Sequence, residues 1–121
     1  MFPYNYALEK LSNAVRILAT GEGDVRSRLW PAYLEFHTLQ VKDFPPDQQA
    51  DYDWIMKELT KRKPRDQLER LEWANDGSVP ANLRRMINRT GSRIARKICD
   101  LEYHVQLAHE EWWQSLVKPP K

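Results

Sequence analysis

Apolar and small residues recur at helical spacing along the last third of the chain. Between Ser78 and Trp113 the recurring positions are Leu83, Met86, Ile87, Thr90, Ile94, Ile98, Leu101, Val105, Ala108 and Trp112. At about 100° per residue they fall on one stripe roughly 120° wide. This pattern predicts one long C-terminal helix that faces a core. Gly91 lies near the edge of the stripe, where we expect close approach by a neighbouring helix; a hinge over residues 90–92 is the alternative.

Three earlier segments show the same helical period. Their predicted ranges are 4–20, 25–42 and 47–61, with a shorter helical segment over 66–73. Asp24 is a good N-cap for the second helix, and Pro31 inside that helix predicts either a kink or a later start. No segment shows the alternation typical of a strand. The sequence therefore predicts an all-α fold: a small bundle of four main helices with a long C-terminal helix, in a single helical domain over residues 1–121.

The composition is that of a globular protein. The chain has 121 residues, of which 41% are hydrophobic and 30% charged. Five Trp and five Tyr favour a packed core or an interface over disorder. The single cysteine cannot form an internal disulfide, and neither a signal peptide nor a long apolar run is visible. We therefore expect a cytoplasmic protein with no membrane association.

Charge is distributed unevenly, although the formal net charge is only +2. Residues 61–97 carry eleven basic and four acidic groups, a net charge of +7, while residues 41–60 carry two and five, a net charge of −3. Within the basic segment, four arginines follow one another at helical spacing: Arg85, Arg89, Arg93 and Arg96. Such a row can bind phosphates and would suit a nucleic-acid-associated accessory protein. The competing interpretation is a solvated helix face that pairs with the acidic residues of 43–58.

A second set of apolar residues lies on the far side of two predicted helices. Trp30 and Leu34 stand opposite the main apolar face of the second helix, as do Tyr103 and Leu107 on the C-terminal one. Helices that are apolar on two sides lie centrally in a bundle or in an interface. Trp113 follows Trp112 directly, and adjacent helical residues cannot both face one core.

We therefore predict a non-enzymatic interaction module that binds a protein partner or a second copy of itself. The predicted partner-binding residues are Trp30, Leu34, Tyr103, Leu107 and Trp113. Binding of nucleic acid through the arginine row is the alternative function, and packing of the apolar residues into the core is the alternative explanation of their pattern.

Candidate catalytic residues are few. Asp100 and His104 stand one helical turn apart, with Glu111 two turns further on the same flank. A carboxylate beside an imidazole can orient a general base, and the three groups together could ligate a metal. Pairs with this spacing usually only stabilise the helix, and we favour that interpretation. Cys99 has no histidine at helical contact distance, and no glycine-rich phosphate-binding loop is present. The sequence predicts no enzymatic activity, no cofactor and no metal site.

Two groups of residues carry a resemblance to known sequences. The first is Gly77-Ser78-Val79 followed by the segments 83–86 and 94–98, and the second is Asp43-Phe44-Pro45 ahead of Trp54-Ile55. In these positions the chain resembles small, uncharacterised helical proteins of bacteria. The resemblance covers most of the chain and implies a bacterial origin, but it carries no activity, ligand or partner.

Overall fold

The computed structural model describes residues 1–60 and 67–117, apart from five side chains between residues 69 and 76. All regular structure in this part of the chain is helical, which confirms the predicted all-α class. The elements are α1 (Asn5–Thr20), α2 (Val25–Phe36), α3 (Gln49–Thr60), α4 (Gln67–Asp76), α5 (Ser78–Arg85) and α6 (Asn88–Val117), with single 3-10 turns at Val41–Asp43 and Pro46–Gln48. No described helix is long and apolar enough to span a bilayer.

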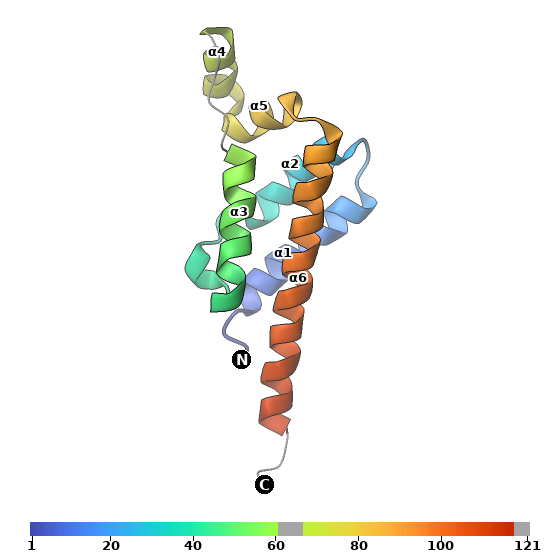
Figure 1. Cartoon of the computed structure of the whole chain (residues 1–121), viewed down its shortest axis with the longest axis vertical. Helices are drawn as coiled ribbons and strands as arrows, with labels where there is room; N and C mark the ends of the chain where they lie inside the picture. Colours follow the sequence, from blue (N-terminus) through green and yellow to red (C-terminus); the bar gives the residue numbers. More distant parts are fainter. Residues whose placement is uncertain (61–66, 118–121) are drawn as a thin grey trace.

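The predicted bundle of four main helices is wrong in its count, because the long C-terminal helix is divided. Residues 78–85 and 88–117 form two helices, so among the described side chains the buried ones come from five helices (α1, α2, α3, α5 and α6). Met86 adopts an extended conformation (ψ 141°) and its carbonyl accepts a hydrogen bond from Arg26 at 3.0 Å. The bend turns α5 across the ends of α2 and α3 (Figure 1). Ile87, at the bend, is consequently 65% exposed although it falls on the predicted stripe.

The second predicted helix also ends early, at Phe36 and not at residue 42. Pro31 lies inside this helix, so it does not mark the start; α2 begins at Val25, and the Asp24 side chain accepts from the Ser27 amide. Beyond Phe36 the backbone carbonyls lack helical partners, and the hydroxyl of Tyr52 on α3 supplies one. This long-range contact has no local signal in the sequence.

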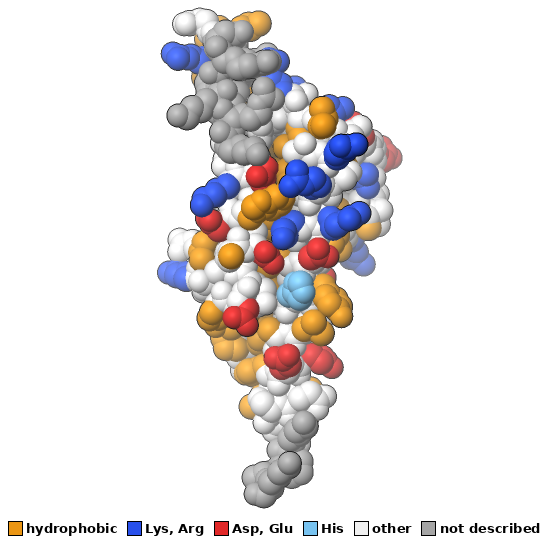
Figure 2. All heavy atoms as spheres, viewed as in Figure 1, with side chains coloured by type: hydrophobic (Ala, Val, Ile, Leu, Met, Phe, Trp, Pro, Cys, Tyr) orange, Lys and Arg blue, Asp and Glu red, His pale blue; other side chains and the backbone are white. Residues whose placement is uncertain are grey.

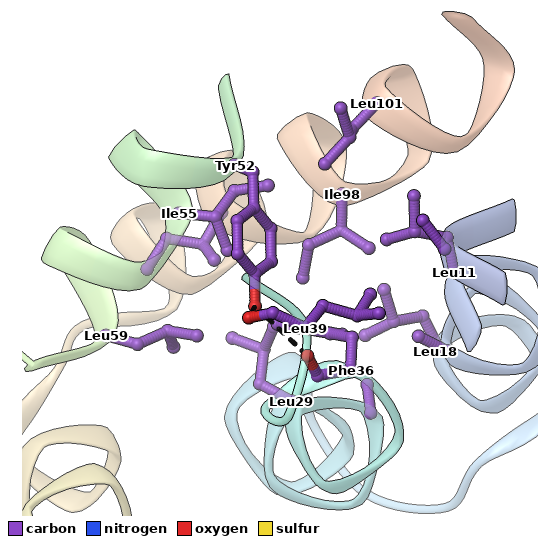
Figure 3. Close-up of a cluster of buried hydrophobic side chains, with 14 of the residues drawn as sticks. Leu11, Leu18, Leu29, Phe36, Leu39, Tyr52, Ile55, Leu59, Ile98 and Leu101 are labelled. Atoms are coloured by element: carbon purple, nitrogen blue, oxygen red, sulfur yellow. Dashed lines mark hydrogen bonds between the residues drawn. The ribbon is translucent and has the colours of Figure 1, made fainter. Parts of the chain in front are cut away.

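The core forms where α6 is packed against α1, α2 and α3. Figure 3 shows Leu11 and Leu18 of α1 and Leu29 of α2 meeting side chains of α3 and α6. The fully buried residues that α6 contributes are Ile94, Ile98, Leu101 and Val105. They recur at the spacing that predicted the helix, so the apolar stripe is confirmed from Ile94 onward.

Gly91 allows α2 to approach α6 closely, as predicted. A Cβ atom added at this position would stand 3.0 Å from Cγ1 of Val25. α6 is continuous through the glycine, so the alternative of a hinge over residues 90–92 is wrong; the chain bends instead at Met86.

The molecule is elongated, because α6 is 30 residues long, or about 45 Å. Figure 1 shows its last turns extending past the other helices, while α4 stands off the opposite end. Side chains near the end of α6, including Leu116 and Val117, are exposed. One end of α6 is thus held in the core and the other is free of it.

The Tyr52 hydroxyl joins α3 to the end of α2. It donates to the carbonyl oxygens of Phe36 (3.0 Å) and Leu39 (2.7 Å), and its burial raises the pKa of Tyr52 well above that of a free phenol. We expect Tyr52→Phe to lower the free energy of unfolding by about 1–3 kcal/mol, since it leaves the Leu39 carbonyl without its donor, whereas the Phe36 carbonyl keeps the amide of Leu39 at 3.0 Å. Urea denaturation followed by circular dichroism measures the change. Tyr33→Phe is the matched control, because no hydrogen bond of the Tyr33 hydroxyl is found among the described residues; equal losses in both variants would contradict the assignment.

Candidate functional site

The outer face of α6 carries one continuous row of exposed residues. We call this row the outer stripe; its members are Arg89, Arg93, Arg96, Asp100, Tyr103, Leu107, Glu110, Gln114 and Val117, and every one of them is exposed. Their spacing alternates between four and three residues, as it does along any one side of an α-helix, so the row forms a continuous face that another helix could contact. The opposite side of α6 faces the core, so no described element covers the outer stripe.

The first third of the outer stripe is basic. Figure 2 shows lysine and arginine side chains gathered over the upper part of α6. Arg93 and Lys97 lie over the ring of Trp54, at 6.0 and 5.5 Å from its centre, and Lys97 also pairs with Asp51 at 3.4 Å. The positive charge of this end is therefore partly neutralised on the side that faces α3, whereas Arg89 and Arg96 have no ion pair among the described residues.

The predicted arginine row is shorter than expected, because Arg85 lies on α5. The bend at Met86 separates it from α6, so it does not extend the line of Arg89, Arg93 and Arg96. Arg85 is engaged in an interaction of its own. The prediction assumed a continuous helix and is wrong for this one residue.

The middle of the outer stripe is apolar. Tyr103 is 59% and Leu107 is 43% exposed, and the Tyr103 ring lies 5.8 Å from that of His104. Figure 2 shows hydrophobic side chains beside the histidine on this face. The alternative that these two residues belong to the core of the chain does not hold, since both face away from it.

The last third of the outer stripe is flanked by acidic residues. Glu110 and Glu111 are exposed and, together with Leu107, line a shallow hollow. Sequence patterns did not assign them to a docking surface: Glu111 was considered only with Asp100 and His104, as a catalytic or metal-binding group, and Glu110 was not singled out. Their signal was present as a charge reversal along the helix face, with three arginines near the start of the outer stripe and Glu110, beside Glu111, toward its end.

The other predicted partner-binding residues lie in different places. Trp30 is half-buried, stacks on Tyr33 at 5.7 Å and lines a hollow of about 360 Å³ together with Pro80 and Leu83. Leu34 is 48% exposed on α2. The five predicted residues therefore do not line a common hollow, and the two on α2 are separate from the outer stripe.

Trp113 lies beside the N-terminal segment. Trp112 is half-buried against Phe2, with ring centres 5.8 Å apart, whereas Trp113 is 50% exposed and borders a hollow with Met1 and Phe2. The two adjacent tryptophans face different surroundings, as their positions on a helix require. Trp112 anchors α6 to the N-terminal segment together with His109, whose ring centre lies 5.0 Å from that of Phe2.

The residues considered for catalysis are not arranged as a catalytic or metal-binding site. Asp100 and His104 are both exposed, and the described residues show no hydrogen bond between them. Burial raises the pKa of the Cys99 thiol, and the nearby carboxylates of Asp100 and Glu102 raise it further, so the reactive thiolate is disfavoured. Within the described ranges 1–60 and 67–117, no three His, Cys, Asp or Glu side chains are grouped to hold a metal ion.

Comparison with known proteins adds no family to this geometry. No protein-family model, curated protein or solved structure matches the chain. The bacterial origin implied by the sequence resemblance therefore stays a prediction.

The exposure of Tyr103 and Leu107 predicts that the fold does not need them. We expect the double variant Tyr103→Ser, Leu107→Ser to keep its helical circular dichroism and to lose no more than a few degrees in Tm, as expected for two exposed helical substitutions. The matched control is Leu101→Ser, Val105→Ser, which changes two fully buried residues of the same turns. The control should unfold, since it places two hydroxyls in the core. Unfolding of the first variant would show that its residues are core after all.

Proposed function

We propose that this protein is a non-enzymatic interaction module whose docking surface is the outer stripe of α6. The observation that carries the proposal is a row of nine exposed residues, forming one continuous helix face and centred on the apolar Tyr103 and Leu107. Isolated exposed apolar residues are common and need no explanation. Here Tyr103 and Leu107 stand one turn apart on the uncovered face of a long helix, between charged residues, which supports a helical or helix-like protein partner.

The electrostatics of the surface also support protein recognition. Basic, apolar and acidic residues follow one another along one helix face within about 30 Å, from Arg89 to Glu110. Opposite charges that flank an apolar centre select both the partner and its direction. The hollows along the described chain are shallow and open to solvent, which favours a docking role over an enzymatic one.

The proposal is tested by placing a photo-crosslinking amino acid on the outer stripe. We expect p-benzoylphenylalanine at Leu107 to give a discrete covalent adduct with a protein in cells that produce this chain naturally. The same amino acid at Lys57, an exposed position of α3, is the matched control and should give none. An adduct is expected to disappear when Arg93→Glu is added, since the docking surface includes both positions. Equal adducts at both positions, or none at Leu107, would overturn the proposal.

Nucleic-acid binding is a second candidate, favoured by the basic end of the outer stripe. Arg89, Arg93 and Arg96 are exposed on one helix, and Trp54 beside them offers an aromatic edge to an open hollow of about 350 Å³. Arginines spaced along a helix match successive phosphates. Asp51 and Asp100 next to them weaken the positive potential, so this candidate ranks second.

Fluorescence polarisation with labelled duplex DNA and single-stranded RNA separates the two candidates. If the three arginines each contact a phosphate, log K should fall by about 2.7 per decade of salt on duplex DNA. Arg89→Glu, Arg93→Glu should abolish that binding, whereas Arg16→Glu, Lys42→Glu, which changes the net charge equally elsewhere, should leave most of it. Binding that is absent at low salt, or equally reduced by both variants, would exclude the arginines as a nucleic-acid site.

A further inference from the structure

The order of charges along the outer stripe suits one kind of partner in particular. Basic residues occupy its start, Glu110 lies toward its end with Glu111 beside it, and Asp100 and the apolar pair Tyr103 and Leu107 lie between them. A helix with this order is complementary to itself when a second copy runs in the opposite direction. In a parallel pair, by contrast, each arginine would face the same arginine, and like charges held together repel.

We infer that the outer stripe of α6 pairs antiparallel with the outer stripe of a second copy of this chain, forming a two-fold symmetric dimer. The inference rests on the proposed function, since it names the occupant of the same docking surface. A two-fold axis brings one patch against the identical patch, so residue i of one copy meets residue j of the other and the reverse contact repeats it.

Among the registers in which the stripe superposes on itself, the pairing of Arg93 with Glu110 selects one. With the two-fold axis midway between residues 101 and 102, Arg93 and Glu110 lie about 13 Å on either side of it. Arg93 of each copy then faces Glu110 of the other, and Asp100 of each copy faces Tyr103 of the other. The phenol can donate to the carboxylate, so the one acidic residue near the centre of the stripe also gains a partner.

The same register places Leu107 against the aliphatic part of an arginine side chain. Arg96 of one copy faces Leu107 of the other, and the methylene groups of an arginine cover apolar surface while its guanidinium stays at the rim. Glu111 of the second copy follows one turn after Leu107, within reach of that guanidinium. Each copy therefore has a charged or polar partner for the groups that flank its apolar centre.

The fold leaves room for this arrangement. In each copy α1 and α2 pass behind α6, and α3 lies beside it, where Trp54 contacts Arg93 (Figure 1). Two copies can meet face to face without another described helix between them. Because the interface holds two apolar side chains per copy and several exposed charges, we expect a reversible dimer that weakens as the ionic strength rises.

Sedimentation equilibrium on the complete chain tests the inference. At protein concentrations on the order of 100 μM, where a micromolar dimer is formed, the wild type should sediment as a dimer at an ionic strength of about 0.05 M and dissociate toward 1 M. Arg93→Glu and Glu110→Arg should each weaken dimerisation at least tenfold. Both side chains are exposed, so circular dichroism and Tm should stay close to those of the wild type.

A double variant that exchanges the charges of Arg93 and Glu110 is the decisive control for pairing between copies. Arg93 and Glu110 are 17 residues apart on one rigid helix, about 25 Å, so they cannot compensate each other within a single chain. The double variant Arg93→Glu, Glu110→Arg should therefore regain dimerisation only through contacts between copies. An equimolar mixture of the two single variants should likewise form a heterodimer, because each mismatched end then meets its complement.

The outcomes distinguish this inference from the proposed function. A wild type that stays monomeric at both ionic strengths, or single variants that dimerise as well as the wild type, overturns self-pairing. If the Leu107 photo-crosslink then joins the chain to a protein of another mass, the docking surface stands and only its occupant changes. If the wild type is monomeric and no crosslink forms, both proposals fail.

Discussion

Burial of the inner side of α6 is the interaction on which the rest of the structure depends. Ile94, Ile98, Leu101 and Val105 are fully buried, and α1, α2 and α3 all contact this helix. Burying a side chain of this size is worth about 1.5–3 kcal/mol relative to exposure. Four of them along one helix therefore contribute an amount comparable to the whole stability of a small domain. Committing one side of α6 to the core also determines which of its residues remain outside.

The helical period was the most dependable information in the sequence. The positions of α1 and α6, the buried stripe and the close contact at Gly91 follow from residue spacing and from the size of a side chain, both of which are local. The end of α2 and the bend at Met86 follow from contacts between distant residues. The Tyr52 hydroxyl satisfies carbonyls at the end of α2, and Arg26 holds the carbonyl of Met86. Neither contact can be predicted from the pattern of hydrophobic positions along the sequence.

The candidate site was predictable in its parts but not as a whole. Tyr103 and Leu107 were recognised as apolar residues on the wrong side of a helix, and the arginines as a basic row. The sequence could not show that α5 carries Arg85 away from α6, or that Trp30 and Leu34 lie on a different part of the surface. It did contain the alternating spacing that joins the arginines to Glu110, but that relation has meaning only when all these residues belong to one uncovered helix.

The free end of α6 has a further consequence for dynamics. Its last turns extend beyond the core and are held chiefly by their own backbone hydrogen bonds, which in an isolated helix are only marginally stable. Their amide protons should therefore exchange with solvent by local fraying, far faster than those around Ile98, whose release requires opening of the core. The helix thus combines a long segment packed against the core with a short free end after Trp112, and a molecule that contacts this end should slow its amide exchange.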